Sequence, residues 1–184
     1  RITALLEGRV APKPESNNEE TLDIEQYAQD QLKEYISRKF RGHDLSRLVN
    51  ELLNAQGYKT HLSPAGSDGG ADILAGSGAM GFDPPRLCVQ VKSQDSPVDV
   101  SVLRELQGIL KNFSAEQGLL VSLGGFKSSV HSEARKVYFE IRLWDANDLV
   151  QNLLDNYEKL REEIRAELPL KRIWALVLEE TEAR

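Results

Sequence analysis

The amino-acid sequence predicts an α/β fold, a three-layer αβα sandwich in which helices cover both faces of a mixed central β-sheet. Amphipathic helical patterns alternate with short strand patterns between residues 22 and 166. The strand GLLVSL at 118–123 is apolar throughout, as expected of a strand that is covered on both faces. Two strands, at 71–75 and 86–93, flank a turn-rich loop and are therefore expected to pair antiparallel.

The first half of the chain is predicted to contain two helices and three strands. Residues 1–20 are rich in Pro, Asn and Glu, and they are interpreted as an N-terminal segment and linker that ends a missing upstream region. An accessory helix at 21–41 ends in the basic cluster Arg38, Lys39 and Arg41, where cations suit the helix dipole. A second helix, expected at 44–56, is followed by strands at 58–62, 71–75 and 86–93.

The second half continues the alternation. Helices are expected at 99–113, 128–137 and 146–166, and strands at 118–123 and 139–143. The apolar segment at 170–178 has no clear assignment. The chain is thus divided into the accessory helix at 21–41, a main domain at 42–154 and a C-terminal helical extension at 155–184.

Composition restricts the class of protein. No apolar run approaches the roughly eighteen residues that span a bilayer, so no membrane partner is expected. Cys88 is the only cysteine, which excludes an internal disulfide and favours an intracellular, cytoplasmic location. The net charge of −6 lies at the two ends, because residues 1–30 carry −4 and residues 155–184 carry −2. The neutral body can therefore still bind a polyanion such as DNA through a local basic face.

The candidate chemistry lies in SDGGADI (67–73) and in QVK, which begins eighteen residues after Asp72. Gln90 and Lys92 are two residues apart on one strand, so their side chains project from the same face. If the strands at 71–75 and 86–93 pair, a carboxylate, an amide oxygen and an ammonium converge. Oxygen ligands hold Mg²⁺, and an adjacent ammonium can orient water or stabilise charge on phosphorus. The alternative is an Asp–Lys ion pair at a strand end, with the glycines shaping a turn.

The chain between residues 42 and 154 resembles the Mrr-like branch of the PD-(D/E)XK restriction endonuclease superfamily. The resemblance covers GHDLSRLVNELLNAQGY (42–58), SDGGADIL (67–74), LCVQVKS (87–93), LRELQGIL (103–110), GLLVSLGGF (118–126) and IRLWDANDLVQNLL (141–154). It implies a restriction-endonuclease-like fold and hydrolysis of DNA, in the restriction of foreign or modified DNA. It also implies Mg²⁺ as cofactor, with Mn²⁺ as a substitute. Asp72, Gln90 and Lys92 would be catalytic, and Asp72, Gln90 and the Val91 carbonyl would hold the metal.

Further candidates surround this set. Asp68 matches a position of the family that can bind a second metal or a water. The family often has a glutamate on its first core helix, at the position of Ser46, so Asp44 and Glu51 are considered as substitutes on the same helix. For both residues, a solvated helix flank is the competing interpretation. Gln107 could point towards the site or be a partly buried polar residue.

Lys127, Ser128 and Ser129 open a helix whose N–H groups could bind a DNA phosphate, although simple capping by Ser128 explains them equally well. Arg86 could belong to a basic DNA-binding face or to an ordinary solvated surface. Two rival functions stay open. One is a DNA-binding module that retains the nuclease fold without turnover. The other is an interaction protein whose helices at 22–40 and 146–166 form a homodimer, and a nuclease could also act as a homodimer.

Overall fold

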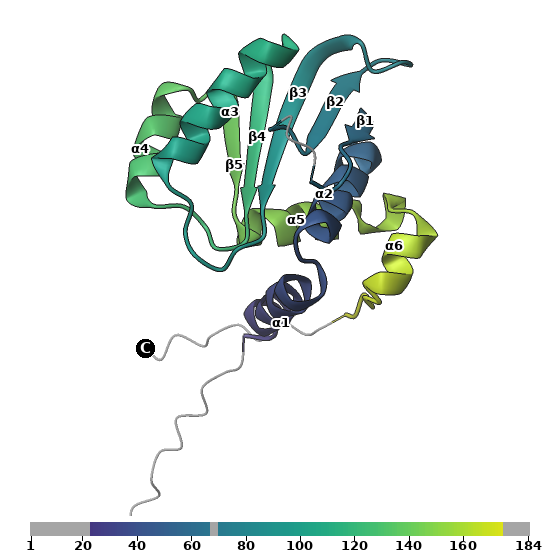
Figure 1. Cartoon of the computed structure of the whole chain (residues 1–184). Helices are drawn as coiled ribbons and strands as arrows, with labels where there is room; N and C mark the ends of the chain where they lie inside the picture. The colour runs from purple at the N-terminus through teal and green to yellow at the C-terminus, as the bar shows by residue number, and fades with distance from the viewer. Residues whose placement is uncertain (1–22, 67–69, 175–184) are drawn as a thin grey trace, which may run out of the picture.

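A computed structural model describes residues 23–66 and 70–174. Figure 1 shows a central sheet with helices packed against both of its faces, so the predicted αβα sandwich is confirmed. Within these two ranges, no helix combines the length and apolar character needed to cross a membrane.

The sheet contains five strands in the order β1-β2-β3-β4-β5, which is also their order along the chain. The strands are β1 (Lys59–Leu62), β2 (Ile73–Ser77), β3 (Asp83–Lys92), β4 (Gln117–Ser122) and β5 (Ile141–Trp144). The pairs β1–β2 and β2–β3 are antiparallel, as predicted for the latter, whereas β3–β4 and β4–β5 are parallel. The beginning of β2 therefore lies at the same edge of the sheet as the ends of β3, β4 and β5.

One face of the sheet is covered by α2 (His43–Ala55) and α5 (Ala146–Asn156), and α1 (Ile24–Lys39) and α6 (Glu162–Glu167) join the core of this layer. On α2 the apolar residues recur every three or four positions, so they form one stripe that packs on the sheet. The core of this layer includes Leu45, Leu48, Leu52, Ile73, Val89, Leu119, Val121, Leu149 and Leu153. Because α2 is fixed along its whole length, it can position groups beside the start of β2.

The opposite face is covered by α3 (Val100–Phe113) and α4 (Ser128–Lys136). Leu103 and Leu106 of α3 pack with Cys88 of β3 and Leu120 of β4. Successive side chains of a strand point to opposite faces, so Gln90 follows Cys88 towards α3. This layer therefore brings α3 close to the QVK segment.

The helix expected at 146–166 is interrupted, and that prediction was wrong. The structure has α5, a short 3₁₀ helix, η1 (Tyr157–Lys159), and then α6. Leu160 and Arg161 are extended between η1 and α6. This break lets Leu160, Ile164 and Leu168 enter the α1/α2/α5 core, which a straight helix could not reach. Of the apolar segment at 170–178, residues 175–178 lie outside the described residues, and Leu170 packs partly against the same core.

The accessory helix joins that core through Leu32, Ile36 and Phe40. Its Tyr35 hydroxyl donates to the Glu167 carbonyl at 2.8 Å, which links α1 to the end of α6. The α1–α2 junction is also attached to the sheet, since the Gly42 N–H donates to Ser93 Oγ at 2.9 Å. The basic end of α1 is thereby held directly after Lys92, at the edge where β3 ends.

Candidate active site

Asp72 stands immediately before β2 and is held against β3 by two hydrogen bonds. Its backbone N–H donates to the Val89 carbonyl at 2.8 Å. Its Oδ2 accepts from the Val91 N–H at 2.7 Å. The antiparallel register, with Ile73 opposite Val89, places Asp72 beside the QVK segment. Two hydrogen bonds to backbone groups of β3 thus bring Asp72 next to this strand, as predicted.

The glycine before Ala71 has a specific steric role. Gly70 has φ +78°, a conformation that favours glycine. A Cβ at this position would lie 2.7 Å from Cδ1 of Ile109 on α3. The turn can therefore pass close to α3 only with glycine here, and this close passage places the Gly70 carbonyl beside Gln90.

Gln90 is only 2% exposed, and its amide has a defined orientation. Its Nε2 donates to the Gly70 carbonyl at 2.8 Å and to Glu105 Oε1 at 3.3 Å. Its Oε1 is buried without a hydrogen-bond partner among the described residues. Buried polar atoms are normally paired, so this oxygen is suited to an added ligand such as a cation.

Lys92 ends β3 and is partly buried, in register with Ser122 of β4. The charge of Lys92 affects the pKa of the Asp72 carboxyl. Burial raises the pKa of the Asp72 carboxyl, and three groups oppose that shift: the Val91 N–H, the Lys92 ammonium and His43. The carboxylate therefore sits in a site that disfavours its charge, and an added cation would favour the ionised form.

A cavity of about 280 Å³ opens beside Asp72. Its walls include Ser46 and His43 from α2, Val91 from β3 and residues 64–66. Ser46, the position at which the family resemblance implies a glutamate, thus lines this cavity and contributes a hydroxyl rather than a carboxylate.

The donors fit a hard divalent cation that prefers oxygen. Asp72 offers a carboxylate oxygen and Gln90 its unpartnered amide oxygen. The Val91 N–H faces Asp72, and in a β-strand the C=O of the same residue faces the same side. Across residues 23–66 and 70–174, no group of three or more His, Cys, Asp or Glu side chains could hold a metal. The candidate site therefore depends on an amide and a backbone carbonyl beside one carboxylate.

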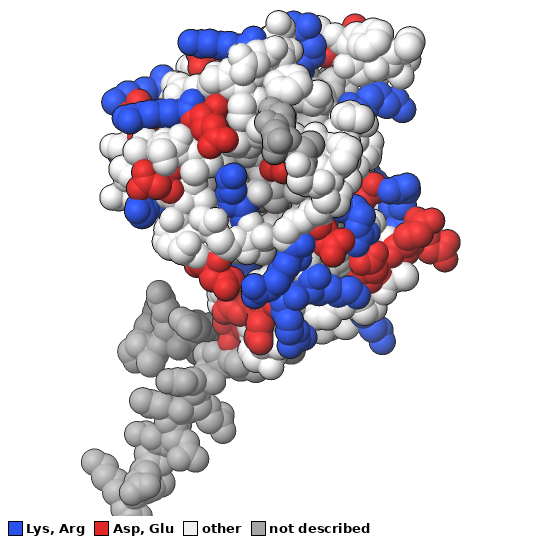
Figure 2. Space-filling model, in the orientation of Figure 1, with Lys and Arg blue, Asp and Glu red and all other residues white. Residues whose placement is uncertain are grey.

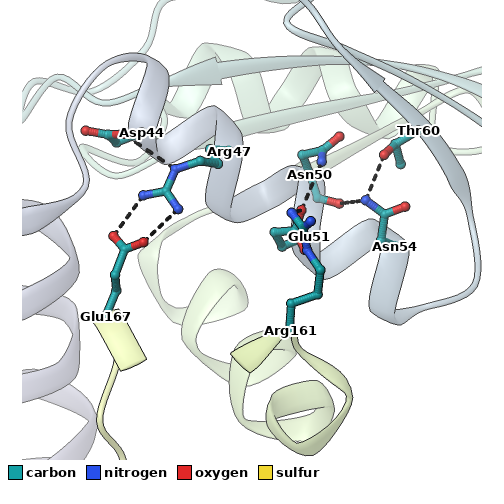
Figure 3. A network of polar contacts seen from close by, with 8 residues as sticks. All are labelled: Asp44, Arg47, Asn50, Glu51, Asn54, Thr60, Arg161 and Glu167. Carbon is teal, nitrogen blue, oxygen red and sulfur yellow. Dashed lines mark hydrogen bonds and ion pairs between the residues drawn. The ribbon is translucent and has the colours of Figure 1, made fainter. Parts of the chain in front are cut away.

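The two helix acids considered as substitutes are engaged elsewhere (Figure 3). Glu51 is 4% exposed and accepts from Arg161, whose Nε lies 2.7 Å from Glu51 Oε2. Asp44 lies 3.6 Å from Arg47, which is itself bound to Glu167. Neither carboxylate lines the cavity beside Asp72. The structure therefore does not bring Asp44 or Glu51 to the site, because arginines hold both, and Asp68 lies outside the described residues.

The candidate DNA-binding residues separate into two groups. Lys127 is the N-cap of α4, and Lys127, Ser128 and Ser129 are all exposed. They lie at the edge where β4 ends, because a bridge joins Phe126 to Val98. Ser128 does not cap the helix, since it is already the first helical residue. Arg86 lies six residues before Lys92, about 20 Å along β3, and is bound to Glu116, so it is not at the site.

Two site residues were missed by the sequence interpretation. His43, which no sequence pattern singles out, lines the cavity beside Asp72. Glu105 was not singled out, although it contacts Gln90. Gln107, two residues later, instead lines a different cavity with Arg104 and Glu116. The spacing on α3 could have suggested Glu105 only if the register between α3 and β3 had been known.

Comparison with known proteins agrees with the fold. A family model described as "Restriction endonuclease", the Mrr catalytic family, matches residues 37–153. Among solved structures, the chain is similar to the MspJI restriction endonuclease in complex with a 27-mer oligonucleotide. That match has a TM-score of 0.54 and 16% identity, and it covers 79% of this chain and 36% of that one.

A second similar structure is AspBHI, a DNA modification-dependent restriction endonuclease. Here the TM-score is 0.56 and the identity 19%, over 77% of this chain and 38% of that one. The chain thus spans less than two-fifths of the length of either structure. A search of curated proteins found no match. Because the family model covers well over half of the sequence, and the fold agrees, the chain belongs to the restriction endonuclease family, whose domains act on DNA and generally use divalent metal ions.

Proposed function

We propose that this chain is the catalytic domain of an Mg²⁺-dependent endonuclease that hydrolyses phosphodiester bonds of DNA. The observation that carries the proposal is the buried Gln90 Oε1, which has no hydrogen-bond partner among the described residues. Gln90 directly precedes Val91, whose N–H donates to the Asp72 carboxylate. A buried polar oxygen without a partner is unfavourable for the fold alone, and together with a desolvated carboxylate next to the same strand it favours a cation site.

The residues have distinct roles in this proposal. Asp72, Gln90 and the Val91 carbonyl hold Mg²⁺, and Mn²⁺ fits the same oxygen donors. A divalent ion bound there supplies a more acidic water and polarises the scissile phosphate. Lys92, whose charge acts on Asp72, orients the attacking water and stabilises the negative charge that develops on phosphorus. Hydrolysis adds the water oxygen to phosphorus and breaks one phosphorus–oxygen ester bond.

The DNA backbone approaches along the edge where β3 and β4 end. The exposed cluster Arg38, Lys39 and Arg41 lies on one side of this edge, at the end of α1. Figure 2 shows Lys and Arg side chains gathered over α1 and the beginning of α2, with acidic side chains beside them. Lys127, Ser128 and Ser129 lie on the other side, at the N-terminus of α4, where backbone N–H groups favour a phosphate. Lys127 is paired with Asp99 at 2.9 Å, but both are about half exposed, so a phosphate can replace the carboxylate at little cost.

Restriction of foreign or modified DNA is the biological role we propose. The similar AspBHI structure is that of a modification-dependent enzyme, which supports this substrate class. A homodimer would supply two sites for cutting both strands of a duplex.

A DNA-binding module without turnover is the second candidate, and one observation favours it. Ser46, 3% exposed, lines the cavity where a glutamate would add a second negative charge, so Asp72 is the only carboxylate among the described residues that line it. Weak metal binding would leave the DNA-binding surface intact and the chemistry slow.

Plasmid cleavage tests the two candidates. The wild-type chain is incubated with unmodified and with cytosine-methylated plasmid in Mg²⁺, Mn²⁺ or EDTA, beside Asp72→Asn, Lys92→Ala and the control Arg86→Ala. Metal-dependent nicking that persists in Arg86→Ala and is lost in the other two variants supports the endonuclease. Retarded migration of DNA without nicking, with either metal and either plasmid, supports the binding module.

A further inference from the structure

We propose that Glu105 is a positioning residue that holds the Gln90 amide so that its Oε1 stays directed to the metal. The inference rests on the proposed function and adds a residue to it. Glu105 does not bind the cation in this proposal. It acts through the hydrogen bond from Gln90 Nε2, whose length is 3.3 Å.

The hydrogen-bond chemistry of the amide permits only one orientation. A glutamine amide has two N–H donors on nitrogen and acceptor lone pairs on oxygen. Both neighbours of Gln90 Nε2, the Gly70 carbonyl and the Glu105 carboxylate, are acceptors. Rotating the amide by half a turn would place its oxygen against these two acceptors, which is repulsive. Two acceptors on one side therefore fix Oε1 on the other side.

The burial of Gln90 explains why a protein side chain, rather than water, orients its amide. Gln90 is 2% exposed, so solvent has little access to replace a missing acceptor. Glu105 is exposed, so its own charge carries little desolvation cost. Leu103 and Leu106, both fully buried, anchor α3 against the sheet on either side of Glu105. The carboxylate is thus attached to a rigid helix and reaches one buried amide.

Two substitutions separate positioning from direct binding of the cation. Glu105→Ala removes the acceptor, whereas Glu105→Gln keeps an oxygen acceptor and removes only the negative charge. Gln107→Ala is the matched control, because it lies on the same helix but lines a different cavity. Alanine and glutamine are both good helix formers, and Glu105 is exposed and Gln107 only partly buried, so all three variants are expected to fold.

The primary measurement is Mn²⁺ binding by calorimetry, without DNA, on wild type and these variants. Loss of a hydrogen-bond partner behind a metal ligand typically weakens binding about 10- to 100-fold. We expect Glu105→Ala to lose affinity by at least about tenfold. We expect Glu105→Gln and Gln107→Ala to stay within about threefold of wild type, since neither removes the acceptor. An NMR spectrum of the Gln90 side-chain amide protons should show faster exchange with water in Glu105→Ala alone.

The outcomes distinguish this inference from the proposed function. If Gln90→Ala binds Mn²⁺ as well as wild type does, or if wild type binds none, the metal site itself is wrong. If binding depends on Gln90 but Glu105→Ala equals wild type, only the positioning role is overturned. If Glu105→Gln is as weak as Glu105→Ala, the charge of Glu105 acts on the cation directly, and positioning is again overturned.

Discussion

Two polar regions of this molecule differ in whether their polar and charged groups have partners. Between α2 and the C-terminal segment, two acidic side chains have arginine partners: Glu51 binds Arg161, and Glu167 binds Arg47 (Figure 3). At the end of β3, Asp72 is bound by the Val91 N–H, and Gln90 leaves a buried oxygen unpaired among the described residues. The compensated charges stabilise the fold. The uncompensated groups support the metal site that we propose at the end of β3.

The pKa shifts show the same difference. The Arg47 guanidinium lowers the pKa of the Glu167 carboxyl, so ionised Glu167 contributes to stability. Burial raises the pKa of the Asp72 carboxyl, so ionised Asp72 opposes folding in the absence of a cation. The buried Asp72 carboxylate therefore lowers stability when it is ionised without a cation, and this effect can be measured.

The largest effect is expected for Asp72→Asn. Loss of the carboxylate should reduce DNA cleavage by at least about hundredfold, as for removal of one key electrostatic group.

The same variant should also change stability. Without metal at pH 7, Asp72→Asn should be at least as stable as wild type, because Asn has no charge to desolvate. In wild type the raised pKa makes the Asp72 contribution favourable below its unfolded pKa and unfavourable as pH rises through the folded pKa. Urea denaturation at pH 4 and pH 7 should therefore show a larger advantage of Asp72→Asn at pH 7. A smaller stability advantage of Asp72→Asn over wild type at pH 7 than at pH 4 would contradict this.

Arg161→Ala should cause the largest loss of stability in the compensated region. It leaves Glu51, 4% exposed, as a buried charge without its guanidinium partner. Breaking a fully buried pair costs about 3–5 kcal/mol, and since Arg161 is two-thirds exposed we expect about 2 kcal/mol. Urea denaturation measures this loss, and cleavage per folded molecule should not change. The double variant Glu51→Gln/Arg161→Ala should recover part of the stability. Equal loss in both variants would show that the charge of Glu51 is not the cause.

Arg47→Ala should have a smaller effect. Arg47 and Glu167 each keep about a third of their side-chain exposure, so water and salt screen the pair. We expect a loss of about 1 kcal/mol or less, and the difference from wild type should shrink in 1 M NaCl. A difference that is independent of salt would indicate packing rather than charge.

The smallest effect is expected for Arg86→Ala, near the start of β3 and far from the candidate site. Arg86 lowers the pKa of the Glu116 carboxyl to about 2. A depressed pKa contributes stability above the unfolded value of 4.5 and loses it as pH falls towards 2. The variant should therefore match wild type at about pH 2 and be slightly less stable at pH 7. DNA affinity and cleavage should be unchanged, and a clear loss of DNA affinity would restore Arg86 to the DNA-binding face.

The fold was predictable because its signals are local. Apolar residues repeat at helical spacing on α2 and α3, and β4 is apolar from Gly118 to Val121, so the layers follow from pattern alone. The break near Leu160 was not predictable, because Leu160, Ile164 and Leu168 keep helical spacing while the chain turns to follow the core. Only the tertiary position of that core decides where the helix must stop.

The site was predictable where the chain itself determines geometry. Gln90 and Lys92 share a strand face by their spacing, and Asp72 follows from the hairpin pairing. Glu105 and His43 could not be found, because they come from helices whose register against the sheet is set by packing. Glu51 was considered in sequence either as a substitute metal ligand or as part of a solvated helix flank, and the structure shows it bound to Arg161, which is 110 residues away along the chain.

The most direct test of this account is a crystal structure of the chain with Ca²⁺ and a short DNA duplex, since Ca²⁺ prefers oxygen ligands. The account predicts one ion held by the Asp72 carboxylate, Gln90 Oε1 and the Val91 carbonyl at about 2.3–2.6 Å, with Lys92 facing the bound phosphate. An ion bound elsewhere, with Gln90 Oε1 still without a partner, would contradict it.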